Sequence, residues 1–262
     1  MTCCPTKTKL FSFSGFDSHL IVKALADSPL MEKMDAIPLN SEKFKMLSVN
    51  ELTFLDSSAF LQGSLSSLVE TLVKSNHQFD IVKEAGYSEK DLKLLLRKGV
   101  YPYDYVTDLS RLNVTNLPPR KKFYSKLKAE NITRKDYSHA CKVWKHFQCR
   151  NLSDYTETYV ASDVLLLAEC VINLRNMIQK EFELDLANYL SLPMLAKDIM
   201  LKESQVKMEL ISDHEMINLI RKNIRGGLSY VNTRYCDLDK MKNLHPDEDF
   251  AILYADANNL VS

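Results

Sequence analysis

A run of apolar residues spaced alternately four and three apart is the feature that most constrains the fold of this chain. It comprises Val160, Val164, Leu167, Val171, Leu174 and Ile178. This spacing places the six side chains on one side of an α-helix. Ser153 stands before the run as a candidate N-cap, because its hydroxyl can accept a hydrogen bond from the first helical turn. The sequence therefore predicts a long helix whose apolar stripe is buried in the core.

Short apolar segments in the first part of the chain predict strands between helices. Residues 9–13 predict a strand that turns into a helix, and Asp17 lies at this corner, where an Asp is most often the helix N-cap. Residues 52–57 predict a second strand, and residues 60–73 predict a helix. The polar residues 28–50, with Pro and Ser, indicate a hairpin or excursion between them. The pattern predicts an α/β fold.

A last apolar segment, residues 250–260, contains a strand pattern that ends at the carboxylate of Asp256. A carboxylate at the end of a buried strand can hold a divalent cation at the rim of a sheet. The alternative is a strand followed by an Asx turn, because the side chains of Asp-Ala-Asn-Asn can bond their own backbone. The spacing alone favours the turn.

The stretch from residue 120 to residue 145 is strongly basic, with nine Lys or Arg against two acidic residues. The whole chain has 34 Lys plus Arg and 34 Asp plus Glu, so any phosphate-binding surface must be local. Four aromatic residues are interleaved with the charges: Phe123, Tyr124, Tyr137 and Trp144. Two interpretations stay open. The stretch is a solvated helical face, or it is a track for single-stranded DNA in which Lys121 and Lys122 contact the backbone.

Cysteine spacing and hydropathy argue against disulfide bonds, a zinc site, a membrane span and a signal peptide. The six cysteines include no Cys-x-x-Cys pair, which favours reduced thiols. His139, Cys141, His146 and Cys149 lie close in sequence, but on one helix their side chains diverge, so no zinc site is expected. No apolar run approaches the roughly 18 residues of a membrane span, and no signal-peptide core is visible. The expected location is intracellular, with nucleus and cytoplasm not distinguished.

Several short motifs stand in a definite order along the chain. They are S-G-F-D-S-H-L around Asp17, K-G-V-Y-P-Y-D-Y at residues 98–105, Y-x-x-x-D from Tyr159 to Asp163, the pair Gly226-Gly227, and D-A-N-N-L around Asp256. Together they resemble the family B DNA polymerases of the protein-primed type, found in viruses and in self-synthesising Maverick-Polinton transposons. In that resemblance Asp17 belongs to the second exonuclease motif, Tyr159 and Asp163 to the third, and Asp256 to the first palm motif.

The resemblance implies a fold and a domain organisation. Residues 1–190 are expected to form a ribonuclease-H-like 3′–5′ exonuclease domain that lacks its first strands. Residues 191–262 are expected to form a linker and the beginning of the polymerase palm domain. The expected function is DNA-directed DNA polymerase, that is, nucleotidyl transfer in DNA replication.

The resemblance also implies roles for individual residues. It makes Asp17, Asp163 and Asp256 catalytic metal ligands, Tyr159 the residue that positions the attacking water, and Arg225, Gly226 and Gly227 contacts to DNA. The implied cofactor is Mg²⁺ in two-metal sites. The implied partners are DNA template and primer, deoxynucleoside triphosphates and a terminal protein that acts as primer.

The number of acidic residues leads to a further expectation about this chain. Only sixteen residues precede Asp17 and none of them is acidic, whereas the family's exonuclease uses about four carboxylates, some of them upstream. The sequence also ends soon after Asp256, before a second palm carboxylate. We therefore expect a polymerase fragment that is inactive by itself. The alternatives are a non-catalytic remnant that binds single-stranded DNA and a free-standing nuclease.

Overall fold

The computed structural model of the chain describes residues 8–11, 16–26, 28, 33–40, 43–97, 99–224, 235–244, 246, 248 and 250. The chain divides into two compact units, Met1–Val206 and Lys207–Ser262. The first unit contains the sheet and the helices α1 to α7, and the second contains α8 and α9.

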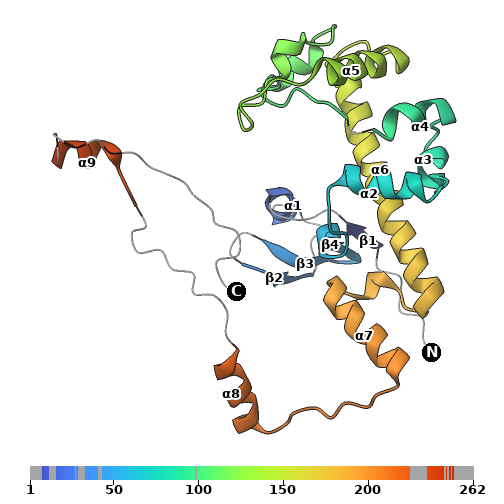
Figure 1. Cartoon of the computed structure of the whole chain (residues 1–262), viewed down its shortest axis with the longest axis vertical. Helices are drawn as coiled ribbons and strands as arrows, with labels where there is room; N and C mark the ends of the chain where they lie inside the picture. The colour runs from blue at the N-terminus through green and yellow to red at the C-terminus, as the bar shows by residue number, and fades with distance from the viewer. Residues whose placement is uncertain are drawn as a thin grey trace. The chain divides into compact units, whose positions relative to one another are not determined.

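A four-stranded mixed sheet forms the beginning of the first unit (Figure 1). Its strands are β1 (Thr8–Phe11), β2 (Met34–Pro38), β3 (Phe44–Val49) and β4 (Leu52–Leu55), in the spatial order β1-β4-β3-β2. The pair β1–β4 is parallel, whereas β2, β3 and β4 pair antiparallel. A parallel pair needs a crossover connection, which α1 (Phe16–Ala26) and the β2–β3 hairpin supply. The predicted strands and hairpin are confirmed over the described residues.

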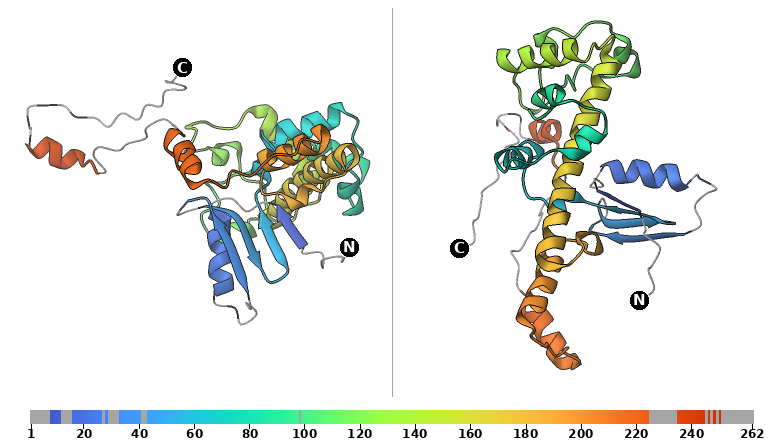
Figure 2. Two further views of the ribbon diagram at one scale, coloured as in Figure 1. Left: turned by 90° about the horizontal axis from the view of Figure 1, so that it is seen from below. Right: turned by 90° about the vertical axis from the view of Figure 1, so that its right-hand side faces the viewer.

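Helix α1 lies over one face of this sheet, as Figure 2 shows. Its residues Ile21, Val22 and Leu25 pack against the buried side chains of Leu47 and Val49 on β3. These contacts form because α1 presents apolar residues at helical spacing and β3 presents alternate residues to the same face. The mixed α/β class predicted from the sequence is confirmed, in a chain that is mostly helical.

The rest of the first unit is helical. Its α-helices are α2 (Leu65–Lys74), α3 (Asp80–Glu84), α4 (Glu89–Leu95), α5 (Arg134–His146), α6 (Leu152–Phe182) and α7 (Leu192–Ser204), with short 3₁₀ helices at Ser57–Ala59, Leu109–Asn113, Arg120–Phe123 and Leu186–Asn188. The prediction that a helix begins at residue 60 is wrong. Gly63 has a φ of 134°, which no helix accommodates, and the helix begins only after Ser64. The Ser64 hydroxyl accepts a hydrogen bond from the backbone N–H of Ser67 at 3.2 Å.

The 31-residue helix α6 is the long helix that the apolar stripe predicts, but two details differ from the prediction. Its N-cap is Asn151 and not Ser153, because the Asn151 side chain accepts from the backbone N–H of Asp154 at 3.0 Å. The stripe is only partly core. Val171 and Ile178 are buried, whereas Val160 and Val164 are 51% and 59% exposed.

Neighbouring helices explain why the buried face of α6 differs from the predicted stripe. The helices α2, α3 and α4 pack against Leu166 and Cys170, and this contact buries a face next to the expected one. On that face Glu169 is 2% exposed, accepts from the backbone N–H of Val82 at 3.1 Å and lies 2.8 Å from His77 Nε2. A buried carboxylate is tolerated only with such partners. Through its contacts with His77 and Val82, Glu169 therefore connects α3 and the segment before it to α6.

The second unit contains α8 (His214–Asn223) and α9 (Leu238–Leu244) among its described residues. The predicted Gly226-Gly227 element and almost all of the predicted strand at residues 250–260 lie outside the described residues. No helix in the described part of the chain is long and apolar enough to cross a membrane.

Candidate functional site

Tyr159 and Asp163 line one cavity of about 170 Å³ in the first unit. They stand four residues apart on α6, so their side chains leave the helix one turn apart on the same side. The other walls come from the start of α2, with Ser64 and Ser66, and from the end of α4 together with Arg97 and Gly99. The cavity thus brings together the two residues of the Y-x-x-x-D motif and several residues that no sequence motif indicates.

The hydroxyl of Tyr159 is fixed by a second tyrosine from the 99–105 segment. The two hydroxyls of Tyr103 and Tyr159 share a hydrogen bond of 2.7 Å. The rings of Tyr101 and Tyr159 lie 5.2 Å apart between centroids. Aromatic pairs at this separation stabilise one another beyond the area they bury. The Tyr159 side chain is therefore held at its ring and at its hydroxyl.

Because Gly99 has no side chain, the Tyr159 ring can lie against the backbone at this position. A Cβ atom at position 99 would lie 2.7 Å from Cδ2 and Cε2 of Tyr159, closer than carbon atoms approach one another. Only glycine allows the backbone to lie this close to the ring. Nothing in the sequence near Tyr159 indicates this contact, because the two residues are sixty positions apart.

Burial raises the pKa of the Tyr159 phenol, and the hydrogen bond shared with Tyr103 and the negative charge of Asp163 raise it further. All three causes disfavour the phenolate. Tyr159 is therefore a neutral hydroxyl at physiological pH. It can donate and accept hydrogen bonds, but it cannot serve as a base.

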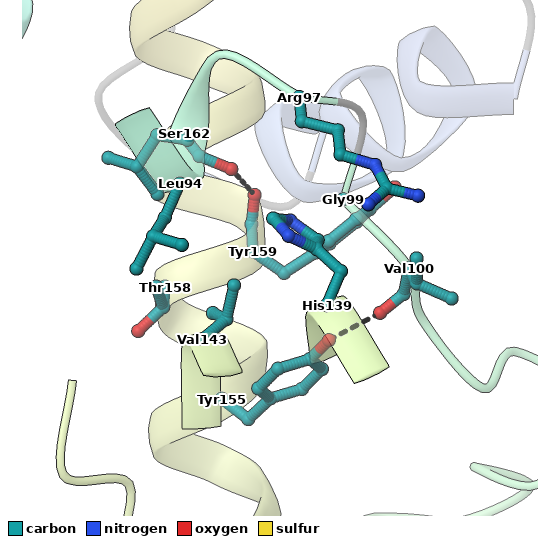
Figure 3. A pocket seen from close by; sticks show the side chains of 11 residues that line it. Leu94, Arg97, Gly99, Val100, His139, Val143, Tyr155, Thr158, Tyr159 and Ser162 are labelled. Carbon is teal, nitrogen blue, oxygen red and sulfur yellow. Dashed lines mark hydrogen bonds between the residues drawn. The ribbon is translucent and has the colours of Figure 1, made fainter. Parts of the chain in front are cut away.

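The 99–105 segment is anchored to α6 by further contacts below Tyr159. Tyr155 is buried and donates its hydroxyl to the carbonyl of Val100 at 2.6 Å (Figure 3). Tyr101 shares a hydrogen bond of 2.9 Å with the Thr156 hydroxyl. The 99–105 segment is thus packed against α6, although Tyr103 itself remains 66% exposed.

Arg97 supplies a positive charge beside this cavity. Its guanidinium pairs with the carboxylate of Asp136 near the start of α5. The hydrogen bond from Thr133 and the charge of Arg97 together lower the pKa of Asp136, so this carboxyl is ionised at neutral pH. No pattern in the sequence indicates Arg97, because its position beside Tyr159 depends on the packing of α4 against α6.

Comparison with known protein families gives a match over most of the chain. The family model described as DNA polymerase type B, organellar and viral, matches residues 6–240. The chain belongs to this family. Comparisons with curated proteins and with solved structures give no match. Membership in a DNA polymerase family implies binding of DNA and deoxynucleoside triphosphates and a metal-dependent reaction.

The structure of the polymerase describes only some of the other predicted site residues. Asp17 lies in the first turn of α1, directly after the connection from β1, and its side chain is outside the described part. Arg225, Gly226, Gly227 and Asp256 also lie outside the described residues. The relation of Asp17 and Asp256 to the cavity therefore stays a prediction.

Lys121 and Lys122 lie on the 3₁₀ helix η3 (Arg120–Phe123), and both are exposed. The Lys122 ammonium is 5.8 Å from the centroid of the Tyr105 ring, and the Arg111 guanidinium is 5.0 Å from the same centroid. Cations are attracted to the face of an aromatic ring. Sites for single-stranded nucleic acid combine such basic groups, which contact the phosphate backbone, with aromatic rings on which bases stack. This places basic and aromatic groups together on the described surface.

Metal-binding groups are sparse in the described part of the polymerase. Those residues include no set of three or more His, Cys, Asp or Glu side chains that could hold a metal ion. Of the four residues considered for zinc, His139 is buried on α5 and Cys149 lies beyond the end of that helix. Among the residues that line the 170 Å³ cavity, those with an oxygen atom in the side chain are Asp163, Tyr159, Ser64 and Ser66.

Proposed function

We propose that this polymerase chain carries a 3′–5′ exonuclease site centred on Tyr159 and Asp163, within a ribonuclease-H-like domain at residues 1–190. The observation that carries the proposal is their shared cavity of about 170 Å³, with the Tyr159 hydroxyl fixed by Tyr103. The parallel pairing of β1 and β4 supports it, because Asp17 follows β1 at the start of α1. Ligand-binding residues of α/β sheets commonly follow strand ends in this way.

The chemistry of the cavity suits Mg²⁺. This ion prefers oxygen ligands and is commonly held through one or two carboxylates, with water and substrate phosphates as the remaining ligands. Asp163 would supply one carboxylate from the cavity wall, and Asp17 is the second ligand that the sequence predicts. When bound, Mg²⁺ would activate water and offset negative charge on the scissile phosphate.

The role of Tyr159 follows from its raised pKa. A neutral phenol held by Tyr103 can hydrogen-bond a water molecule and fix its direction, but it does not remove the proton. Asp163 is one helical turn away and provides the adjacent negative charge. We therefore assign Tyr159 to orientation of the attacking water and Asp163 to metal binding.

The polymerase reaction is assigned to the later part of the chain. We propose that residues 191–262 form the linker and the start of the palm, with Asp256 as a metal ligand for nucleotidyl transfer. In this proposal Arg225, Gly226 and Gly227 contact the template, and a terminal protein provides the primer. The match to organellar and viral polymerases supports this assignment, although the matched region ends at residue 240, before Asp256.

A digestion and extension assay tests both assignments. Purified chain is incubated with end-labelled single-stranded DNA or with a primed template, in the presence of Mg²⁺, alongside Asp163→Asn, Tyr159→Phe and Asp256→Asn. Loss of digestion by about 100-fold or more in Asp163→Asn, with folding retained, supports the exonuclease assignment. Glu157→Gln is the matched control, because Glu157 is exposed on the same helix. The same assay decides the prediction that this chain alone is inactive.

A metal-mapping experiment tests the site independently of turnover. Fe²⁺ in place of Mg²⁺, with ascorbate and peroxide, cleaves a polypeptide near the bound metal. We expect cleavage close to residues 159–163 that Mg²⁺ suppresses and that Asp163→Asn removes. Cleavage that persists unchanged in Asp163→Asn would contradict the assignment of this residue.

The second candidate function is binding of single-stranded DNA without catalysis. It is favoured by the exposed Lys121 and Lys122 and the cations around Tyr105. In a binding assay, Lys121→Gln with Lys122→Gln should weaken affinity and reduce its salt dependence, with each lost phosphate contact lowering the slope by about one. Binding that persists when Asp17, Asp163 and Asp256 are replaced, without any digestion, would favour this function over the enzyme.

A further inference from the structure

A second, smaller cavity lies beside Tyr159 in the first unit. Its volume is about 20 Å³, and its lining includes Arg97, Gly99, His139, Tyr159 and Ser162 (Figure 3). Arg97, Gly99 and Tyr159 also line the 170 Å³ cavity, so the two cavities have a wall in common. A group held in the small cavity would therefore contact residues that also line the 170 Å³ cavity.

His139 contributes an unpaired polar atom to this cavity. The residue is 6% exposed, and its Nε2 is the buried side-chain nitrogen or oxygen that has no hydrogen-bond partner among the described residues. Buried polar atoms in folded proteins are nearly always paired with protein or with ordered water. A cavity of about 20 Å³ exceeds the roughly 10–15 Å³ that one water molecule requires.

The charges around His139 favour a neutral ring. Burial lowers the pKa of His139 most, and the positive charge of Arg97 lowers it further; the charge of Asp136 opposes this in part, and that of Lys142 adds a last, smaller lowering. The titratable groups of α6 at this cavity are the phenols of Tyr155 and Tyr159, both with raised pKa and therefore neutral. In a neutral imidazole Nε2 is either donor or acceptor, and a water molecule can pair with either form.

We propose that the small cavity binds one water molecule on His139 Nε2, and that His139 thereby acts as a positioning residue for Tyr159. Gly99 lies against the Tyr159 ring so closely that a Cβ atom there would be 2.7 Å away. Movement of the ring toward Gly99 is therefore blocked. The water occupies the space that the small cavity would otherwise leave next to the ring. This inference rests on the proposed exonuclease function only for its kinetic consequence, because the water site itself is structural.

A high-resolution crystal structure of the full chain tests the water site. We expect an ordered water at hydrogen-bonding distance from His139 Nε2 in the native protein. The His139→Gln variant, whose amide reaches the same region, should retain it, and His139→Leu should lose it. A dry cavity in the native crystal, or a water that stays in His139→Leu, would overturn the proposal whatever the activity of the chain.

A kinetic cycle tests the positioning role. We expect His139→Leu to slow the turnover step of exonuclease digestion, with kcat roughly tenfold lower and KM little changed, as misplacement of a reacting group does. His139→Gln should restore most of the rate. In a Tyr159→Phe background, His139→Leu should cost nothing further, because its effect passes through the Tyr159 hydroxyl. An equal loss in both backgrounds would show a merely structural role. Absence of digestion in the native chain would instead count against the proposed function and leave the crystallographic test to decide.

Discussion

At the scale of single residues, a glycine controls the position of the side chain most closely linked to the proposed chemistry. Gly99 is remote from Tyr159 in sequence, yet its missing Cβ atom is what lets the ring lie against the backbone. The K-G-V-Y-P-Y-D-Y motif, which in the sequence indicated only the family, thus provides the ring contact at Gly99 and the hydroxyl partner at Tyr103.

Replacing Gly99 with Ala should destabilise the first unit. The added methyl group would meet two ring carbons of Tyr159 at 2.7 Å, and overpacking of this kind costs about 1–3 kcal/mol. Urea unfolding measures the loss. The control is Tyr159→Leu, in which the ring is gone and the same Gly99→Ala change should cost much less. An undiminished loss in that background would mean that the strain arises in the backbone and not at the ring.

His139 should make the stability of the first unit depend on pH. Burial lowers its pKa below the usual value of 6.5, so the unfolded chain binds a proton more readily than the folded one. The stabilisation is complete above about pH 6.5 and is lost as the pH falls through the lower pKa of the folded state. Urea unfolding from pH 8 to pH 5 should therefore show a falling free energy, and His139→Gln should flatten the profile. An identical pH dependence in both proteins would rule out His139 as the cause.

At the scale of secondary-structure elements, the start of α6 has two candidate N-caps, Asn151 in the structure and Ser153 from the sequence, and mutation can distinguish them. Asn151→Ala should lower the free energy of unfolding by about 1 kcal/mol, because it removes the acceptor for the backbone N–H of Asp154. Ser153→Ala should be nearly neutral, since Ser153 is exposed inside the first turn. Chemical denaturation of both variants measures the difference. A larger effect of Ser153→Ala would favour the cap predicted from the sequence.

Helix α6 also shows what local sequence can and cannot predict. Periodicity predicted the helix and the shared side of Tyr159 and Asp163, because both depend only on positions along one element. It did not predict which face is buried, since that depends on α2, α3 and α4, which pack against Leu166 and Cys170. Arg97, Gly99 and Tyr103 were missed for the same reason. Their contacts with the site arise from tertiary packing and leave no periodic pattern in the chain.

At the scale of the whole molecule, the position of α7 bears on the domain boundary. The sequence predicts a boundary between residues 190 and 191, just before α7. In the structure Leu195 is fully buried in a cluster with Phe60, Ile178 and Leu186. The compact first unit extends to Val206. Among the described residues, Ile199 is the last one that belongs to a hydrophobic cluster.

Specific cleavage at the two positions distinguishes the boundaries. A protease recognition site is inserted between residues 206 and 207 in one variant and between 190 and 191 in another. After cleavage and separation of the fragments, residues 1–206 should keep the urea midpoint of the uncut variant, because their packed clusters are complete. Residues 1–190 should lose about 2–5 kcal/mol, the cost of removing a buried leucine, because Leu195 no longer fills its place beside Phe60 and Ile178. If residues 1–190 instead unfold at an unchanged midpoint, α7 belongs with the later part of the chain, and the boundary predicted from the sequence is the better description of this polymerase.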